Sequence, residues 1–232
     1  MELSKRLNAV AGLVTEGASV ADIGTDHGYV PIYLAGTGKC PHVIAMDINR
    51  GPLERAMEHI RAHELESRIE TRLSDGLKSL KKGEADTMIA AGMGGNLTIR
   101  ILDNSPELVE GMEEFILQPQ SEIHKVRKYL NQNGFLLVAE DMVEEDGKFY
   151  PVMKLIHGNE PAFSEEELYY GRILLAEKHP VLHKFLIREK KRKEMICGKL
   201  SAQPGERALL RRGELEKEIS RIRRGLAAYD KA

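Results

Sequence analysis

The sequence predicts an α/β fold, in which an open, mostly parallel, Rossmann-like sheet is followed by a pair of helices. Short apolar segments alternate with helical segments up to about residue 158, which is the pattern of parallel strands joined by helices. A turn with two glycines, at 24–28, joins the first strand to a helix, as in the first unit of a doubly wound sheet. Beyond residue 158 the apolar residues recur at helical spacing.

The first strand and its turn carry the pattern on which the functional prediction depends. Asp22 lies near the end of the strand, and Asp26 lies between Gly24 and Gly28. Glycine lets the backbone approach a ligand, and the next helix offers free N–H groups at its amino end. A carboxylate at position 26 would repel a dinucleotide pyrophosphate but suits a ligand with an ammonium and a sulfonium group. We therefore predict an S-adenosylmethionine (SAM) site with Asp22, Gly24, Thr25, Asp26 and Gly28; a tight turn without a ligand is the alternative.

The second and third strands supply two more acidic residues at the same edge. The strand 42–47 ends in Asp47, 25 residues after Asp22, where an acid can accept hydrogen bonds from ribose hydroxyls. The strand 69–73 is followed by an Asp-Gly pair, whose carboxylate can accept a hydrogen bond from an adenine amine. We expect the nucleoside part of the cofactor to be held by Asp47, Ile48, Asp75 and Gly76. A helix-capping aspartate and an ordinary Asp-Gly turn are the alternatives.

The fourth predicted strand, 85–91, opens into a turn with three glycines in four residues, before a helix at 96–102. In a doubly wound sheet this strand lies beside the first, so the turn faces the ligand crevice. A backbone without side chains can approach a flat ring closely. We expect Gly92 and Met93 to contact the cofactor, and Gly94 and Gly95 to contact a base of the substrate. The alternative is a crowded helix–strand junction.

The remaining strands favour one particular type of α/β sheet. A fifth strand, 114–119, contains Gln118 and precedes a helix at 123–130. Two further strands, 134–143 and 148–157, are joined by a hairpin turn at 145–147. Five βα units closed by a hairpin predict seven strands with the last one antiparallel. That is the usual architecture of class I SAM-dependent methyltransferases, and dinucleotide dehydrogenases usually lack this ending.

The C-terminal part reads as a separate helical region, so we predict domains at 1–158 and 159–232. His179-Pro180 should kink or restart its first helix, and Gln203-Pro204-Gly205 should form a turn. The apolar residues on either side of that turn follow a 3–4 spacing, which predicts an antiparallel coiled-coil hairpin. They are Leu175, Leu182, Leu186, Ile196 and Leu200 before the turn, and Ala208, Leu215, Ile219, Ile222, Leu226 and Tyr229 after it.

Charge is divided unevenly along the chain. Residues 1–183 hold 19 Lys/Arg and 29 Asp/Glu, a net charge of −10, and residues 184–232 hold 15 and 7, a net charge of +8. An acidic body with a basic tail suggests a polyanionic partner such as RNA, gripped by the tail. A solvated charged face is the alternative. The predicted RNA-binding residues of the tail are Arg188, Lys190, Lys191, Arg192, Lys193, Arg211 and Arg221.

Other classes of protein find little support in the composition. The sequence has no run of about 18 apolar residues, and the polar residues near its start do not resemble a signal peptide. Cys40 and Cys197 are expected to be reduced thiols of a cytoplasmic protein, with no metal site. The sequence leaves the oligomeric state open.

Three motifs and the helical tail carry a family resemblance. DIGTDHGYVP at 22–31, AGMGG at 91–95 and LQP at 117–119 resemble motifs of the bacterial tRNA (adenine-N1) methyltransferases that act at tRNA position 22. The resemblance covers essentially the whole chain. It implies that the body binds SAM, that the tail helps to hold tRNA, and that a methyl group is transferred to an adenine.

The expected chemistry makes few demands on catalytic groups. Nitrogen 1 of neutral adenine has a free lone pair, so the enzyme's task is positioning and a negative environment for the cationic product. The base must also leave its stacked setting. We predict that Asp26, His27 and Gln118 contact the base, with Gly94 and Gly95 as RNA contacts. Asp26 could instead hold the ammonium of SAM, and His27 could simply start a helix.

Three other functions compete with this hypothesis. An NAD-dependent oxidoreductase would need a pyrophosphate-binding turn, which Asp26 disfavours. A non-catalytic RNA-binding protein with a nucleotide-binding fold would bind RNA without methyl transfer. A methyltransferase for a protein or a small molecule would not need the basic tail.

Overall fold

The computed structural model describes residues 2–201 and 205–230. Contacts between its elements divide the chain into two compact units, residues 1–162 and 163–232. The boundary predicted from the sequence lies at residue 158 instead. Each unit is described by itself below, and no helix of the described residues is long and apolar enough to cross a membrane.

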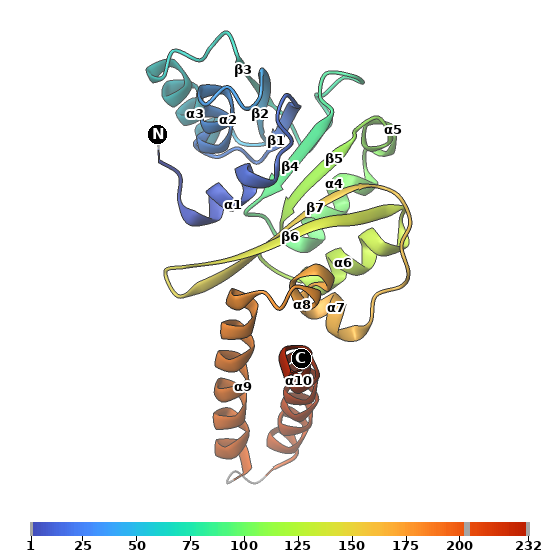
Figure 1. The fold of residues 1–232 in the computed structure, drawn as a ribbon. Coiled ribbons are helices and arrows are strands. Elements are labelled where there is room, and N and C mark those ends of the chain that lie inside the picture. The colour runs from blue at the N-terminus through green and yellow to red at the C-terminus, as the bar shows by residue number, and fades with distance from the viewer. Residues whose placement is uncertain (1, 202–204, 231–232) are drawn as a thin grey trace. The chain divides into compact units, whose positions relative to one another are not determined.

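Unit 1 is built on a seven-stranded sheet with the order β3-β2-β1-β4-β5-β7-β6 (Figure 1). Neighbouring strands from β3 to β5 are parallel, whereas β7 runs antiparallel to both β5 and β6. The predicted Rossmann-like methyltransferase sheet with one reversed strand is therefore confirmed. The strands are β1 (Ser19–Ile23), β2 (His42–Asp47), β3 (Ile69–Leu73), β4 (Thr87–Ala91), β5 (Glu114–Gln118), β6 (Phe135–Glu145) and β7 (Lys148–His157).

Two groups of helices accompany this sheet, with α1 and α2 packed together in one and α4 and α6 in the other. Val10, Ile32 and Ile60, from α1, α2 and α3, are buried with Val20 and Val43 of the sheet in one hydrophobic cluster. Apolar strands covered by amphipathic helices thus form the core. The helices are α1 (Lys5–Leu13), α2 (Tyr29–Gly36), α3 (Arg50–Ala62), α4 (Gly95–Asp103), α5 (Pro106–Glu110) and α6 (Ile123–Gln132).

The expectation of five βα units is wrong at one place, because β3 and β4 are joined by turns and not by a helix. This connection, 74–86, contains two turn sequences, Asp75-Gly76 and Gly83-Glu84, and no extended helical repeat of apolar residues. The guanidinium of Arg72 closes it by pairing with Glu84, with Nη2 to Oε1 at 3.0 Å, and by donating to the carbonyl of Ser79 at 3.1 Å.

Unit 2 contains two short helices and the predicted helical hairpin, which is confirmed. A capping box between Ser164 and Glu167 begins the first short helix. The helix predicted around Leu175 is interrupted, and a new helix begins at Pro180, as the His-Pro pair predicted. Gln203 and Pro204 of the predicted turn lie outside the described residues. The helices are α7 (Glu165–Tyr170), α8 (Arg172–Ala176), α9 (Pro180–Ser201) and α10 (Glu206–Asp230).

Helices α9 and α10 run antiparallel. Near the start of α9, the carbonyl of His179 accepts a hydrogen bond at 2.9 Å from the hydroxyl of Tyr229, near the end of α10. Further along α9, Lys193 pairs with Glu218, which lies about midway along α10. Apolar side chains are buried between the two helices, as the 3–4 spacing predicted. They include Leu182, Leu186, Leu215, Ile219 and Ile222.

Candidate active site

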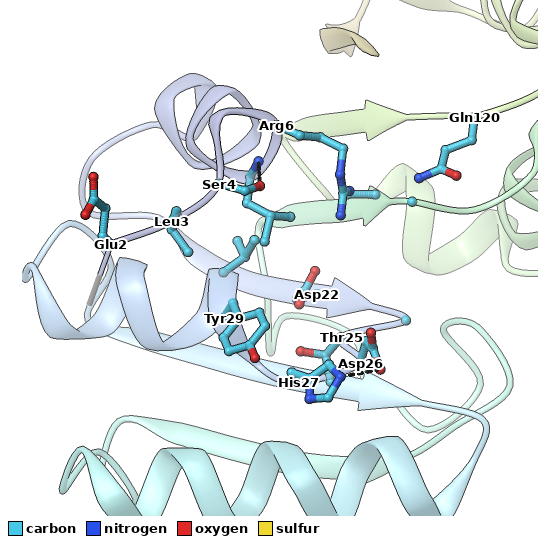
Figure 2. Close-up of a pocket in the computed structure, with 15 residues that line it drawn as sticks. Glu2, Leu3, Ser4, Arg6, Asp22, Thr25, Asp26, His27, Tyr29 and Gln120 are labelled. Atoms are coloured by element: carbon cyan, nitrogen blue, oxygen red, sulfur yellow. Dashed lines mark hydrogen bonds and ion pairs between the residues drawn. The ribbon is translucent and has the colours of Figure 1, made fainter. Parts of the chain in front are cut away.

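A cavity of about 710 Å³ lies in unit 1 at the carboxyl ends of the central strands (Figure 2). Its wall includes the turn after β1, the end of β4 and the amino-terminal part of α1. This is the edge at which ligands bind in open α/β sheets. Five of the predicted cofactor residues line it, namely Asp22, Gly24, Thr25, Asp26 and Gly92.

The turn after β1 is fixed by its neighbours in the sheet and in α3. The N–H groups of Gly24 and Thr25 donate to the carbonyl of Met46 at 2.8 and 3.0 Å. Gly28 has φ +73°, and a Cβ there would lie 3.2 Å from the Cβ of Ala56. Glycine at this position is therefore required by both the left-handed backbone and the close approach of α3.

Asp22 is the most strongly perturbed acid of the cavity. It is buried on β1, between Ala45 of β2 and Ile89 of β4. Burial raises the pKa of Asp22 to about 6, the hydroxyl of Thr25 offsets part of that rise, and the charge of Asp47 adds to it. A buried carboxylate with a raised pKa, next to a cavity, is a candidate partner for a cation.

Asp26 and His27 lie at the rim of the same cavity. Asp26 adopts a left-handed backbone with φ 51°, and its side chain is 65% exposed. Its Oδ1 lies 3.5 Å from Nη2 of Arg55 and 3.6 Å from Nε2 of His27. Aspartate tolerates this backbone better than most residues, and the position keeps a carboxylate facing the ligand space.

The predicted nucleoside-binding residues lie at the same sheet edge but outside the cavity wall. The register pairs Asp47 of β2 with Leu73 of β3, the residue that precedes the turn of Asp75 and Gly76. Asp47 is buried and accepts a hydrogen bond from the N–H of Asn49 at 2.8 Å. Lys78 donates to Asp75 at 2.5 Å, and this hydrogen bond lowers the pKa of Asp75.

The glycine turn after β4 divides into two parts. Gly92 is exposed in the cavity, and the side chain of Met93 extends toward Gly24, whose Cβ, if present, would lie 3.4 Å from the Met93 methyl group. Gly95 is buried, and a Cβ there would lie 2.5 Å from the carbonyl oxygen of Ser121. Gly94 would similarly meet the Ser121 hydroxyl at 3.3 Å. Both glycines lie at a crowded junction with Ser121 and neither lines the cavity, so their predicted contact with RNA stays a prediction.

Gln118 is not placed as the sequence analysis expected. Its side chain is fully buried at the end of β5, and its Oε1 accepts a hydrogen bond at 3.1 Å from Nη1 of Arg6. Arg6 and Gln120 line the cavity in its place (Figure 2). No local sequence pattern points to Arg6, because it lies on α1, whose position relative to the sheet is a tertiary property.

The basic residues of the hairpin differ in their partners. Arg221 lies 3.6 Å above the ring of Tyr169 and pairs with Glu165 at 2.7 Å. Arg211 and Lys193 both reach Glu218, and Arg192 lies near Glu189. Lys190 and Lys191 form no ion pair with the described residues, while Arg188 lies 3.7 Å from Glu189.

Among the described residues, no group of three or more His, Cys, Asp or Glu side chains is arranged to hold a metal ion. Cys40 is buried and Cys197 half-buried, and both are free thiols. The polar side chains that line the candidate site are carboxylates, hydroxyls, the amide of Gln120, the imidazole of His27 and the guanidinium of Arg6.

Comparison with known proteins agrees with this fold. A family described as "Methyltransferase domain" matches residues 3–153. The tRNA (adenine(22)-N(1))-methyltransferase of Bacillus subtilis (strain 168) is 36% identical over 206 residues, which cover 87% of this chain and 87% of that protein.

Solved structures match nearly the whole chain. The crystal structure of the B. subtilis m1A22 tRNA methyltransferase has a TM-score of 0.84 and 33% identity, covering 97% of this chain and 98% of that chain. The Streptococcus pneumoniae protein Sp1610 in complex with S-adenosyl-L-methionine has a TM-score of 0.87 and 33% identity, covering 97% of this chain and 100% of that one. The chain therefore belongs to the bacterial tRNA (adenine(22)-N(1))-methyltransferase family, which confirms the resemblance carried by its motifs.

Proposed function

We propose that this protein transfers a methyl group from SAM to ring nitrogen 1 of an adenine in tRNA, at position 22 as in its B. subtilis relative. The observation that carries the proposal is the buried acidic strand end, Asp22, which opens into a cavity at the ligand edge of the sheet. We expect the enzyme to act in the cytoplasm, as a reaction on tRNA requires.

The cavity suits the amino-acid half of SAM in chemistry, and its size is that of a small-ligand pocket. A volume of about 710 Å³ lies within the range of roughly 300–1,000 Å³ that is common for small-ligand pockets. Asp22 and Asp26 suit the ammonium and the sulfonium of this ligand. The hydroxyl of Thr25 is buried beside the carboxyl group of Asp22, where it would also be within reach of a polar group of the ligand.

The nucleoside half of SAM would extend along the ends of β2 and β3. Asp47 would accept hydrogen bonds from the ribose hydroxyls. Ile48 is 61% exposed and could cover one face of the adenine ring. Asp75 would accept a hydrogen bond from the adenine amine, in competition with the hydrogen bond that it accepts from Lys78. Gly76 supports the turn after β3 through its left-handed backbone, as Gly28 supports the turn after β1.

The chain's own residues would act by positioning and electrostatics. Bound SAM supplies a methyl group on a positively charged sulfur, and transfer leaves a neutral thioether and a cationic adenine ring. The lone pair of adenine nitrogen 1 forms the new bond, so no proton has to be removed first. Asp22 and Asp26 provide the negative environment that stabilises the developing charge on the ring.

Contacts to the edge of the target base fall to the side of the cavity opposite Asp26. Gln120 and Arg6 line that side, so we assign them the contact that the sequence analysis expected of Gln118. Gln118 would orient Arg6 through their 3.1 Å hydrogen bond. His27 remains a candidate for the base contact from the turn side.

The hairpin of α9 and α10 is proposed to grip the tRNA backbone. Lys190 and Lys191 are the best candidates, because they have no acidic partner among the described residues. Arg221, stacked on Tyr169 and paired with Glu165, would mainly stabilise unit 2. Phosphate contacts of this kind supply affinity without base specificity.

The direct test is incubation of the purified protein with labelled SAM and unmodified tRNA, followed by nucleoside analysis. The expected product is 1-methyladenosine at position 22. Binding of NAD in place of SAM would support the oxidoreductase alternative, and tRNA binding without methyl transfer would support a non-catalytic RNA-binding protein. Calorimetry with SAM and with NAD distinguishes a methyltransferase from an oxidoreductase.

A further inference from the structure

Three aromatic side chains gather beside the cavity: His27 in the turn, Tyr29 at the start of α2 and His59 on α3. Their ring centroids lie 5.3, 5.5 and 5.7 Å apart, and their planes differ by only 12°, 14° and 21°. In a column of three rings the outer pair would be much farther apart than the neighbours. The rings therefore form a compact cluster with nearly parallel planes, which we call the aromatic platform.

Contacts with α3 fix the position of the platform. Nδ1 of His59 lies 2.9 Å from the carbonyl oxygen of His27, and a carbonyl can only accept, so this nitrogen carries the proton. Gly28 lies between His27 and Tyr29 in the sequence, and it closely approaches Ala56 of α3. These contacts fix the backbone from which His27 and Tyr29 extend.

The front of the platform is open to the ligand space. Tyr29 is 39% exposed, and both Tyr29 and His27 line the cavity. Figure 2 shows the two side chains next to each other, across the cavity from Arg6 and Gln120. The hydroxyl of Tyr29 makes no hydrogen bond with the described residues. Core packing therefore does not explain why a large aromatic residue is found here.

We infer that the aromatic platform is the stacking site of the target adenine after it leaves the tRNA helix, with Tyr29 as the ring it contacts. The inference rests on the proposed function, in which the methyl acceptor is a base of tRNA. Unstacked bases are commonly bound on aromatic side chains, because stacking recovers part of what the base loses on leaving the helix. A base lying on Tyr29 would be nearly parallel to the other two rings of the platform as well.

The position of the platform explains why the target base, and not a more distant one, is the expected occupant. Tyr29 lines the same cavity as Asp22 and Gly92, so a ring on it would lie within the space that also receives the methyl donor. Arg6 and Gln120, on the other side, would then meet the polar edge of that ring. Face and edge recognition would thus come from opposite walls.

The test uses the full-length protein with Tyr29→Leu and Tyr29→Phe. Leucine removes the π-face, and phenylalanine keeps it. We expect Tyr29→Leu to lower kcat/KM for tRNA roughly 5- to 100-fold, the usual effect of losing one base–aromatic stack, with SAM affinity unchanged. Tyr29→Phe should remain close to the unaltered enzyme. A tRNA with 2-aminopurine at the target position should fluoresce more strongly when bound to Tyr29→Leu, because stacking on tyrosine quenches it.

Helix α3 offers a matched pair of controls. His59→Ala should also lower kcat/KM for tRNA, whereas Glu58→Ala, at the neighbouring exposed position of the same helix and outside the platform, should not. Equal fluorescence and equal kcat/KM for Tyr29→Leu and the unaltered enzyme would overturn the inference, as would a parallel loss of SAM affinity. If the unaltered protein transfers no methyl group to tRNA, the proposed function itself fails.

Discussion

Asp22 illustrates how a single residue can be placed for function at a cost in stability. Its pKa is raised from 3.8 to about 6 by burial, so the folded state binds its proton more tightly than the unfolded state does. The free energy of unfolding must therefore fall as pH rises from about 4 through 6. A cationic ligand next to the charged form would restore part of that loss.

Asp22→Asn should separate these two effects. Without ligand, we expect the variant to be more stable than the unaltered protein at pH 8, by about 1–3 kcal/mol, and the difference should vanish below pH 4. The SAM affinity of the variant should be lower. The affinity of the unaltered protein should increase between pH 5 and 7, whereas that of the variant should stay constant. Urea unfolding and calorimetry at several pH values provide the measurements. A variant that binds SAM normally would remove Asp22 from the cofactor site.

Asp26 calls for a different substitution, because its backbone has φ 51°. Asp26→Ala should lower turnover strongly, but alanine would also strain a left-handed backbone, at a cost of about 1–2 kcal/mol. Asp26→Asn removes the charge and tolerates this conformation. We expect at least a tenfold loss of kcat/KM, which is about 1.4 kcal/mol, with unchanged thermal stability. Normal kcat/KM in Asp26→Asn would show that the acidic turn is not needed.

The positions of individual residues could be predicted from the sequence where a single strand and its following turn determine them. Asp22, Gly24 and Asp26 follow from one strand and one turn, and they line the cavity. Gln118 and Gln120 lie two residues apart, and which of them is buried depends on how the chain leaves β5. Arg6 reaches the cavity from another element, so no local pattern could predict it.

Among the elements, α6 and β6 are joined by a buried ion pair. Nε and Nη2 of Arg127 lie 3.0 and 2.8 Å from Oε1 of Glu140, and both side chains are almost completely buried. Glu140→Gln would leave the guanidinium charge buried, which typically costs about 3–5 kcal/mol. We expect a correspondingly lower free energy of unfolding in urea. The double variant Arg127→Met/Glu140→Leu should recover much of the loss, and an equally unstable double variant would contradict this explanation.

The hairpin predicts a charge effect that depends on which lysines are changed. Lys190→Glu/Lys191→Glu should weaken tRNA binding and reduce the salt slope by about one for each lysine, with SAM affinity unchanged. Lys193 and Arg192 lie near acidic partners, so their reversal would also disturb α9. Lys82→Glu, in the connection that precedes β4, is the control. An unaltered slope in the double variant would argue against the hairpin as an RNA grip.

Most elements were predictable because apolar periodicity and turn residues agree along this chain. The connection 74–86 was the exception: a βαβ pattern suggests a helix there, but its Gly and charged residues favour turns fixed by Arg72. Gly95 shows the complementary limit. Its glycine is required by the carbonyl of Ser121, which lies on a different segment, so the sequence alone could not distinguish packing from ligand contact.

For the molecule as a whole, the sheet and its hydrophobic cluster lie entirely within unit 1. The last strand ends at His157, but the segment after it still contributes to this unit. Glu160 accepts a hydrogen bond from the N–H of Leu137 at 2.9 Å, and the carbonyl of Pro161 accepts one from Asn131 at 3.2 Å. Residues 160–161 therefore belong with the sheet, beyond the boundary that the sequence suggested.

A chain truncated after residue 162 should accordingly unfold cooperatively and bind SAM with the affinity of the full chain, because every proposed cofactor contact lies in unit 1. Its tRNA affinity should fall by about tenfold or more, since the basic helices and their phosphate contacts are gone. Truncation after residue 158 should lose about 1–3 kcal/mol more, as two hydrogen bonds disappear. Calorimetry, urea unfolding and tRNA filter binding measure the three quantities. Loss of SAM binding in a folded 162-residue chain would mean that unit 2 contributes to the cofactor site, and undiminished tRNA binding would place the RNA contacts on the sheet domain.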